Sequence, residues 1–73
     1  MRILNFNKTI YHRDAVLGSI KAFSEVADLK FRETERSLVV FVRAENGLER
    51  EVEDELTNYA LGLTKMKISQ SAA

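Results

Sequence analysis

The chain has 73 residues, 45% of them hydrophobic, and its eleven basic and eleven acidic residues cancel to a net charge of zero at pH 7. A chain of this length forms one domain, residues 1–73, with little room for an enclosed catalytic cavity. Because the charges balance and no apolar run approaches the roughly 18 residues of a membrane span, we expect neither nucleic acid nor membrane as a partner. The absence of cysteine excludes disulfides and thiolate metal sites. We expect a cytoplasmic protein.

Residues 2–8 alternate loosely between apolar and polar, with Leu4 and Phe6 on one side, which indicates a first strand. Asn and Lys are poor strand residues, so we expect an edge strand in which Asn5, Phe6 and Asn7 are available to a partner. From residue 12 or 13 the period changes to that of an amphipathic helix, which we expect to end at Asp28. Its stripe is Val16, Ile20, Phe23 and Ala27.

The next two segments are predicted to form a β-hairpin. Residues 29–34 alternate as a second strand, and the polar residues 33–37 form the turn. Residues 38–42 are the only run of five consecutive apolar residues, and we interpret them as the central strand. Alternation sends Leu38, Val40 and Val42 to one face and Val39 and Phe41 to the other.

A second helix is predicted after Asn46, which can cap it while Glu49 returns a bond to the backbone of Asn46. Its apolar stripe is Leu48, Val52, Leu56, Tyr59 and Leu63. We expect this helix to end at Gly62, residues 65–69 to form either a short fourth strand or a frayed end, and residues 70–73 to be a disordered tail. The fold is therefore an α+β domain of order β-α-β-β-α, an antiparallel sheet with two helices on one face, and ferredoxin-like if the fourth strand forms.

No constellation of catalytic residues is evident in the sequence. His12 is the only histidine and is interpreted as a surface residue near a helix start. Glu51, Asp54 and Glu55 fall on the solvent side of the second helix, and the three glycines are too scattered for a phosphate-binding loop. We therefore expect no enzyme activity, no metal and no cofactor.

The second face of the central strand is the feature that indicates a partner. If both helices cover Leu38, Val40 and Val42, then Val39 and Phe41 face outward, and exposed apolar patches usually mark contact surfaces. The patch predicts a binding platform for a protein or peptide, with strand addition at the sheet edge. The alternative is a homodimer, obligate and structural in role, that buries the same residues, and the tail of the chain could also cover them. An RNA-binding sheet is a more distant alternative, because such sheets stack bases on several aromatic residues.

Two stretches resemble the small His-Xaa-Ser system protein HxsD family. The first runs from Thr9-Ile10-Tyr11 through Asp14 and Ala15 into Ala22-Phe23, and the second is residues 56–61, in which Leu56, Asn58, Tyr59 and Leu61 match the family's segment. Gly62 and Leu63 stand where that family has Arg and Glu. The resemblance implies a noncatalytic accessory protein of a peptide-modification cassette, one that binds the peptide or the radical-SAM enzyme that modifies it.

Overall fold

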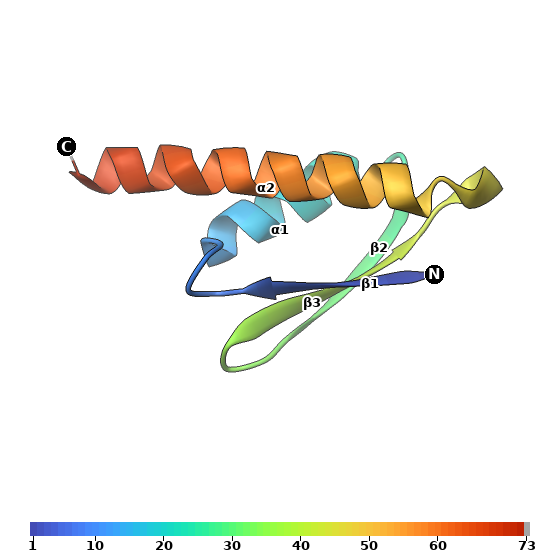
Figure 1. The fold of residues 1–73 in the computed structure, drawn as a ribbon, viewed down its shortest axis with the longest axis horizontal. Helices are drawn as coiled ribbons and strands as arrows, with labels where there is room; N and C mark the ends of the chain where they lie inside the picture. The colour runs from blue at the N-terminus through green and yellow to red at the C-terminus, as the bar shows by residue number, and fades with distance from the viewer. Residues whose placement is uncertain (73) are drawn as a thin grey trace.

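The computed structural model describes residues 1–72, with side chains for residues 1–66. The order of its elements confirms the β-α-β-β-α prediction. The bounds are β1 Arg2–Asn7, α1 Arg13–Phe23, β2 Asp28–Glu33, β3 Ser37–Arg43, the 3-10 turn η1 Glu45–Gly47 and α2 Glu49–Ala72. Both helices lie on one face of the sheet, so the fold is an α+β arrangement of two layers (Figure 1).

The sheet is antiparallel with strand order β1-β3-β2, so β3 is the central strand, as its apolar run predicts. Along β1, Leu4 pairs with Val40 of β3 and Phe6 pairs with Leu38. Along β2, Phe31 also pairs with Val40. Facing residues of an antiparallel pair place their side chains on the same face, so this register assigns every strand residue to the helix face or to the opposite face, which we call the back face.

The hydrophobic core lies between the helix face of the sheet and the two helices. β3 contributes Leu38, Val40 and Val42, each at most 1% exposed. The other buried members of the cluster are Leu4, Phe6, Val16, Ile20, Leu56 and Ala60. The faces predicted for the first and central strands are therefore confirmed. Because α2 presents Leu56, Ala60 and Thr64 at i, i+4 and i+8, its buried stripe is narrower than the predicted one, and Leu48 and Tyr59 are exposed.

α1 ends at Phe23, five residues before the predicted end at Asp28. The chain turns through residues 24–27, where the backbone N–H groups of Val26 and Ala27 both donate to the carbonyl of Phe23. Ala27 is buried, which accounts for its apparent place in the helical stripe. Asp28 instead begins β2.

The predicted capping box at Asn46 and Glu49 does not form. Asn46 and Gly47 both take positive φ, 57° and 70°, in the 3-10 turn η1. The Glu49 side chain instead accepts a hydrogen bond from the backbone N–H of Ala44 at 3.2 Å. This bond stabilises the charged carboxylate and lowers the pKa of Glu49. The hydrogen bond between Ala44 and Glu49 therefore holds together the loop that connects β3 to α2.

α2 passes through Gly62 and continues to Ala72, so the predicted helix end at Gly62 is wrong. Residues 65–69 are helical, and the fourth strand that we considered does not form. The helix continues because the turn after Gly62 packs on α1, where the Thr64 hydroxyl accepts from the backbone N–H of His12 at 3.1 Å. Residues 70–72, expected in a disordered tail, belong to α2, and Ala73 lies outside the described residues.

Candidate functional site

The back face of the sheet carries an apolar centre between a polar side and a cationic side. Ile3 on β1 faces Phe41 on β3, and Phe41 faces Lys30 on β2. In the next row Asn5 faces Val39, which faces Arg32. Val39 and Phe41 are half-buried, whereas Ile3 is 60% exposed. We call Ile3, Val39 and Phe41 the back-face patch.

A shallow depression of about 110 Å³ opens beside Phe41. Its walls are Met1, Asp28, Lys30, Phe41 and Arg43. The ring of Phe41 thus lies among charged side chains, with two cations and one carboxylate around it. Such a depression can hold one apolar side chain of a partner while the flanking cations contact acidic or carbonyl groups.

The outer edge of β1 presents the main-chain groups of residues whose side chains lie on the face that carries this patch. The backbone N–H of Lys8 donates to the carbonyl of Arg36 at 2.8 Å, one step beyond the last paired residues of β1 and β3. Bonding alternates along an antiparallel pair, so the even-numbered residues of β1 bond to β3 and the odd-numbered ones direct their N–H and C=O groups outward. The outward backbone groups therefore belong to Ile3, Asn5 and Asn7, whose side chains lie on the back face.

Phe6 and Asn7 are also predicted to be available at this edge, but groups of both residues are used within the fold. Phe6 is 3% exposed, and its ring packs in the core against Tyr11 with ring centroids 4.9 Å apart. The carbonyl of Asn7 accepts from the backbone N–H groups of Ile10 and Tyr11, which begin the connection to α1. The usable edge is thus Ile3, Asn5 and the N–H of Asn7.

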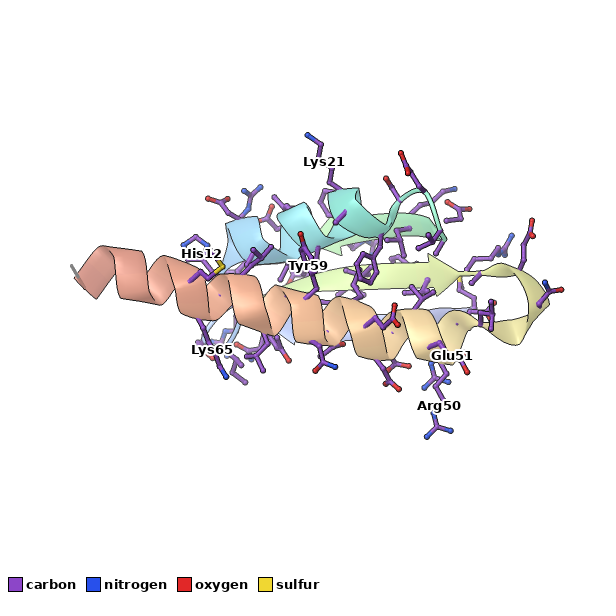
Figure 2. The ribbon with its side chains drawn as sticks, turned by 90° about the horizontal axis from the view of Figure 1, so that it is seen from above. His12, Lys21, Arg50, Glu51, Tyr59 and Lys65 are labelled. Atoms are coloured by element: carbon purple, nitrogen blue, oxygen red, sulfur yellow. The ribbon has the colours of Figure 1, made fainter. Side chains whose placement is uncertain are left out.

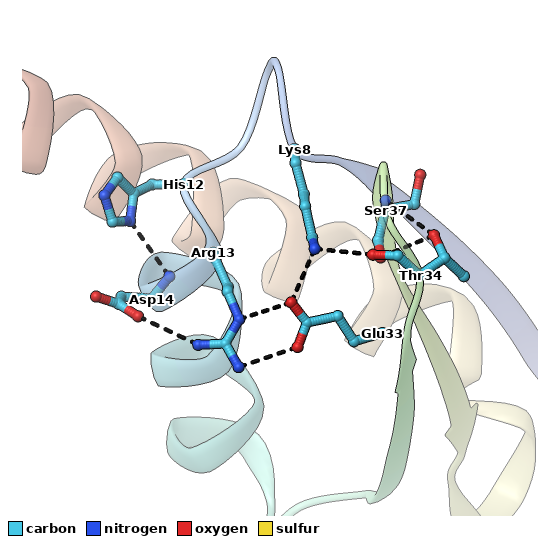
Figure 3. A network of polar contacts seen from close by, with 7 residues as sticks. All are labelled: Lys8, His12, Arg13, Asp14, Glu33, Thr34 and Ser37. Carbon is cyan, nitrogen blue, oxygen red and sulfur yellow. Dashed lines mark hydrogen bonds and ion pairs between the residues drawn. The ribbon is translucent and has the colours of Figure 1, made fainter.

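A polar network around Glu33 holds the C-terminal end of β1 in place (Figure 3). Glu33 accepts bonds from the Arg13 guanidinium at 2.8 and 3.0 Å and from the Lys8 ammonium at 2.8 Å. The hydrogen bonds from Arg13 and then Lys8 stabilise the ionised carboxylate and lower the pKa of Glu33 to about 2. Lys8 also donates to the carbonyl of Thr34, so the end of β1, the start of α1 and the hairpin are tied together.

The other sheet edge, at β2, is less suited to pairing with a second copy. The N–H of Thr34 donates to the carbonyl of Ser37, so the outward main-chain groups of β2 belong to Leu29, Phe31 and Glu33. Antiparallel self-pairing of β2 would place Lys30 and Arg32 of one copy against the same cations of the other. Like charges directly opposite one another are destabilising, and cationic side chains are a common protection of edge strands.

Other chemistry is not assembled by the residues that the structure describes. His12 is exposed, and its Nδ1 accepts from the backbone N–H of Asp14 at 3.2 Å, so it caps α1 as a surface histidine. Within residues 1–66 no three carboxylate, histidine or cysteine side chains gather as metal ligands. Among the helices that the structure describes, neither combines the length and hydrophobicity needed to cross a bilayer.

No family model, no curated protein and no solved structure matches this chain.

Ile3 is the back-face residue that the predicted site left out. The alternation that placed Leu4 and Phe6 in the core also placed Ile3 with Asn5 and Asn7 on the opposite side. Its pairing with Phe41 joins the edge strand to the patch, so the two predicted features form one continuous surface.

Proposed function

We propose that this protein is a noncatalytic binding module that takes up an extended peptide segment alongside β1. The observation that carries the proposal is that Ile3 and Asn5, whose backbone groups point outward from the sheet edge, place their side chains on the same face as Val39 and Phe41. A strand paired with β1 alternates its side chains, so every second one lies on the back face, and the one that pairs with Ile3 lies in the same row as Phe41.

The energetics indicate that main-chain pairing and the patch act together. The N–H and C=O groups of Ile3 and Asn5 allow four hydrogen bonds, each contributing about 0.5–1.5 kcal/mol net. Association costs about 4–15 kcal/mol in lost freedom, so these bonds alone do not hold a peptide. A partner must also cover the back-face patch, and an aromatic or long aliphatic side chain beside Ile3 is the group that reaches it.

The resemblance to the HxsD family supplies a first probe. A synthetic peptide of four His-Xaa-Ser repeats, with valine at Xaa, is titrated into the ¹⁵N-labelled protein and followed by backbone chemical shifts. We expect the amide signals of Ile3, Asn5 and Phe41 to move. Signals of residues on the helix face of β2 serve as the internal reference, and a scrambled peptide of the same composition serves as the control.

Two substitutions at one position separate strand pairing from side-chain contact. Asn5→Pro removes the outward N–H, which an edge strand tolerates, and is expected to abolish binding. Asn5→Ala keeps the N–H and is expected to bind within about twofold of the parent chain. Equal binding by both variants, or amide shifts confined to β2, would contradict pairing at β1.

The homodimer alternative makes a separate prediction about the free protein. It requires a dimer, whereas for the peptide-binding module we expect sedimentation equilibrium at several hundred micromolar to show a monomer. A dimer that a Phe41→Lys variant converts to monomer would instead support burial of the back-face patch between two copies.

A further inference from the structure

A second surface lies between the loop after α1 and the N-terminal half of α2. α1 stops where Phe23 packs on Tyr59, with ring centroids 5.5 Å apart, and Tyr59 points from α2 toward α1 (Figure 2). α2 begins ten residues earlier, so about 15 Å of it extends past the end of α1. Past the end of α1, residues 24–28, which lead into β2, and residues 43–46, at the end of β3 and after it, line the space beside this part of α2. The result is an open groove of about 980 Å³.

Apolar side chains line this groove without being covered. Val26, in the loop after α1, is 68% exposed, and Leu48, in the turn before α2, is 49% exposed. Val52 on α2 also lines the groove and packs against the core. The groove therefore has a hydrophobic lining continuous with the core, and an aliphatic side chain of a partner would remove Val26 and Leu48 from water.

The rim of the groove is strongly acidic. Five carboxylates line it against the single guanidinium of Arg43: Glu25, Asp28, Glu45, Glu51 and Glu55. None of the five belongs to an ion pair within the described side chains. Glu51 and Glu55 stand one turn apart on α2, a spacing at which like charges repel. A bound cationic group relieves that repulsion.

The spacing of these carboxylates favours an extended cationic partner over a metal ion. No three of them come close enough to serve as ligands of one ion, judged over the side chains of residues 1–66. Several lysine or arginine side chains along a peptide match a row of separated carboxylates. We propose that this groove binds a Lys/Arg-rich segment of a protein partner, with an aliphatic residue of that segment seated between Val26 and Leu48.

The proposal is tested with the model peptide acetyl-Lys-Leu-Lys-Lys-Leu-Lys-amide, titrated into the full ¹⁵N-labelled chain. We expect shifts of the amides of Val26, Leu48 and Glu51, and none at Asn5 or Phe41. Because exposed ion pairs are screened by salt, the dissociation constant should rise as NaCl increases from 20 to 150 mM. Absence of binding at millimolar peptide, or shifts on the back face instead, would overturn the proposal.

Matched variants separate the groove from the total charge. Glu51→Gln with Glu55→Gln should weaken binding about fivefold. Glu35→Gln with Asp54→Asn makes the same change in net charge at exposed positions outside the groove and should change affinity less than twofold. Equal weakening by the two pairs would show attraction to overall charge and would overturn the site.

The aliphatic contact has its own test. Leu48→Ala, at a half-exposed position that leaves the core intact, should weaken the leucine-containing peptide severalfold and leave hexalysine unchanged. A control peptide with the same four lysines, acetyl-Lys-Ser-Lys-Lys-Ser-Lys-amide, that binds as tightly as the leucine-containing peptide would remove the apolar component. Asp28 and Arg43 border both this groove and the depression beside Phe41. Val26, Leu48 and Glu51 line only the groove, and Ile3, Asn5 and Val39 belong only to the site beside β1, so shifts at these residues distinguish the failure of one proposal from the failure of the other.

Discussion

Replacement of Gly62 by alanine tests the course of α2 directly. Gly62 lies inside the helix, and a Cβ built there meets nothing within 4 Å. Alanine is favoured over glycine in a helix interior by about 1 kcal/mol, so Gly62→Ala should stabilise the chain by that amount. For a domain of this size the gain corresponds to a rise in the melting temperature of about 6 °C.

The other two glycines calibrate this measurement. At Gly18 an added Cβ would lie 3.5 Å from Cδ1 of Leu63, an ordinary van der Waals contact, so Gly18→Ala should also stabilise by up to about 1 kcal/mol. Gly47 has φ of 70°, where a side chain is strained, and Gly47→Ala should destabilise by about 1 kcal/mol. Thermal and urea unfolding followed by far-UV circular dichroism measure all three variants against the parent.

The sign of the Gly62 effect decides between two structures. If residue 62 ended the helix in a left-handed conformation, alanine would cost about 1 kcal/mol, so the two cases differ by about 2 kcal/mol. A melting temperature lowered by Gly62→Ala, with Gly47→Ala also destabilising, would refute the continuous helix and the packing of Thr64 against His12.

Three further predictions concern stability. Glu33 has a pKa lowered to about 2, below its value in the unfolded chain, so its contribution to the free energy of unfolding is present above about pH 4.5 and is lost as the pH falls toward 2. The difference in urea midpoint between the parent and Glu33→Gln should therefore shrink over that interval. A constant difference would contradict the network. Leu56→Ala empties a fully buried position and should cost about 2–5 kcal/mol by urea denaturation. His12→Ala removes the acceptor for the Asp14 N–H and should cost about 0.5–1 kcal/mol, whereas His12→Asn, which retains a capping oxygen, should cost less.

The parts of the fold that the sequence predicted are those in which one strong local pattern decides the outcome. Residues 38–42 are apolar on both faces, which suits only a central strand, and the alternation assigned Val39 and Phe41 to the back face as observed. The hairpin before them is likewise bounded by two strand patterns with a short polar turn between them.

The errors concern helix ends, where local and tertiary preferences compete. Gly62 is a good C-terminal residue by propensity, but contacts made by Leu63 and Thr64 with α1 continue the helix past it. Asn46 is a good cap, but its positive φ places it in a turn. The groove on the helix side depends on α1 stopping at Phe23 while α2 extends further, a relation between distant segments that no local pattern contains.

The position of β3 between its two neighbours also bears on the order of folding. The pair Glu33 and Leu38 closes a separation of five residues, whereas Asn7 and Ser37 close one of thirty. The longer closure costs about 1.6 kcal/mol more in chain entropy, so the hairpin should form first and β1 should dock late. Until β1 docks, the edge of β3 is open to a competing strand, and docking both closes that edge and brings Leu4 and Phe6 into the core.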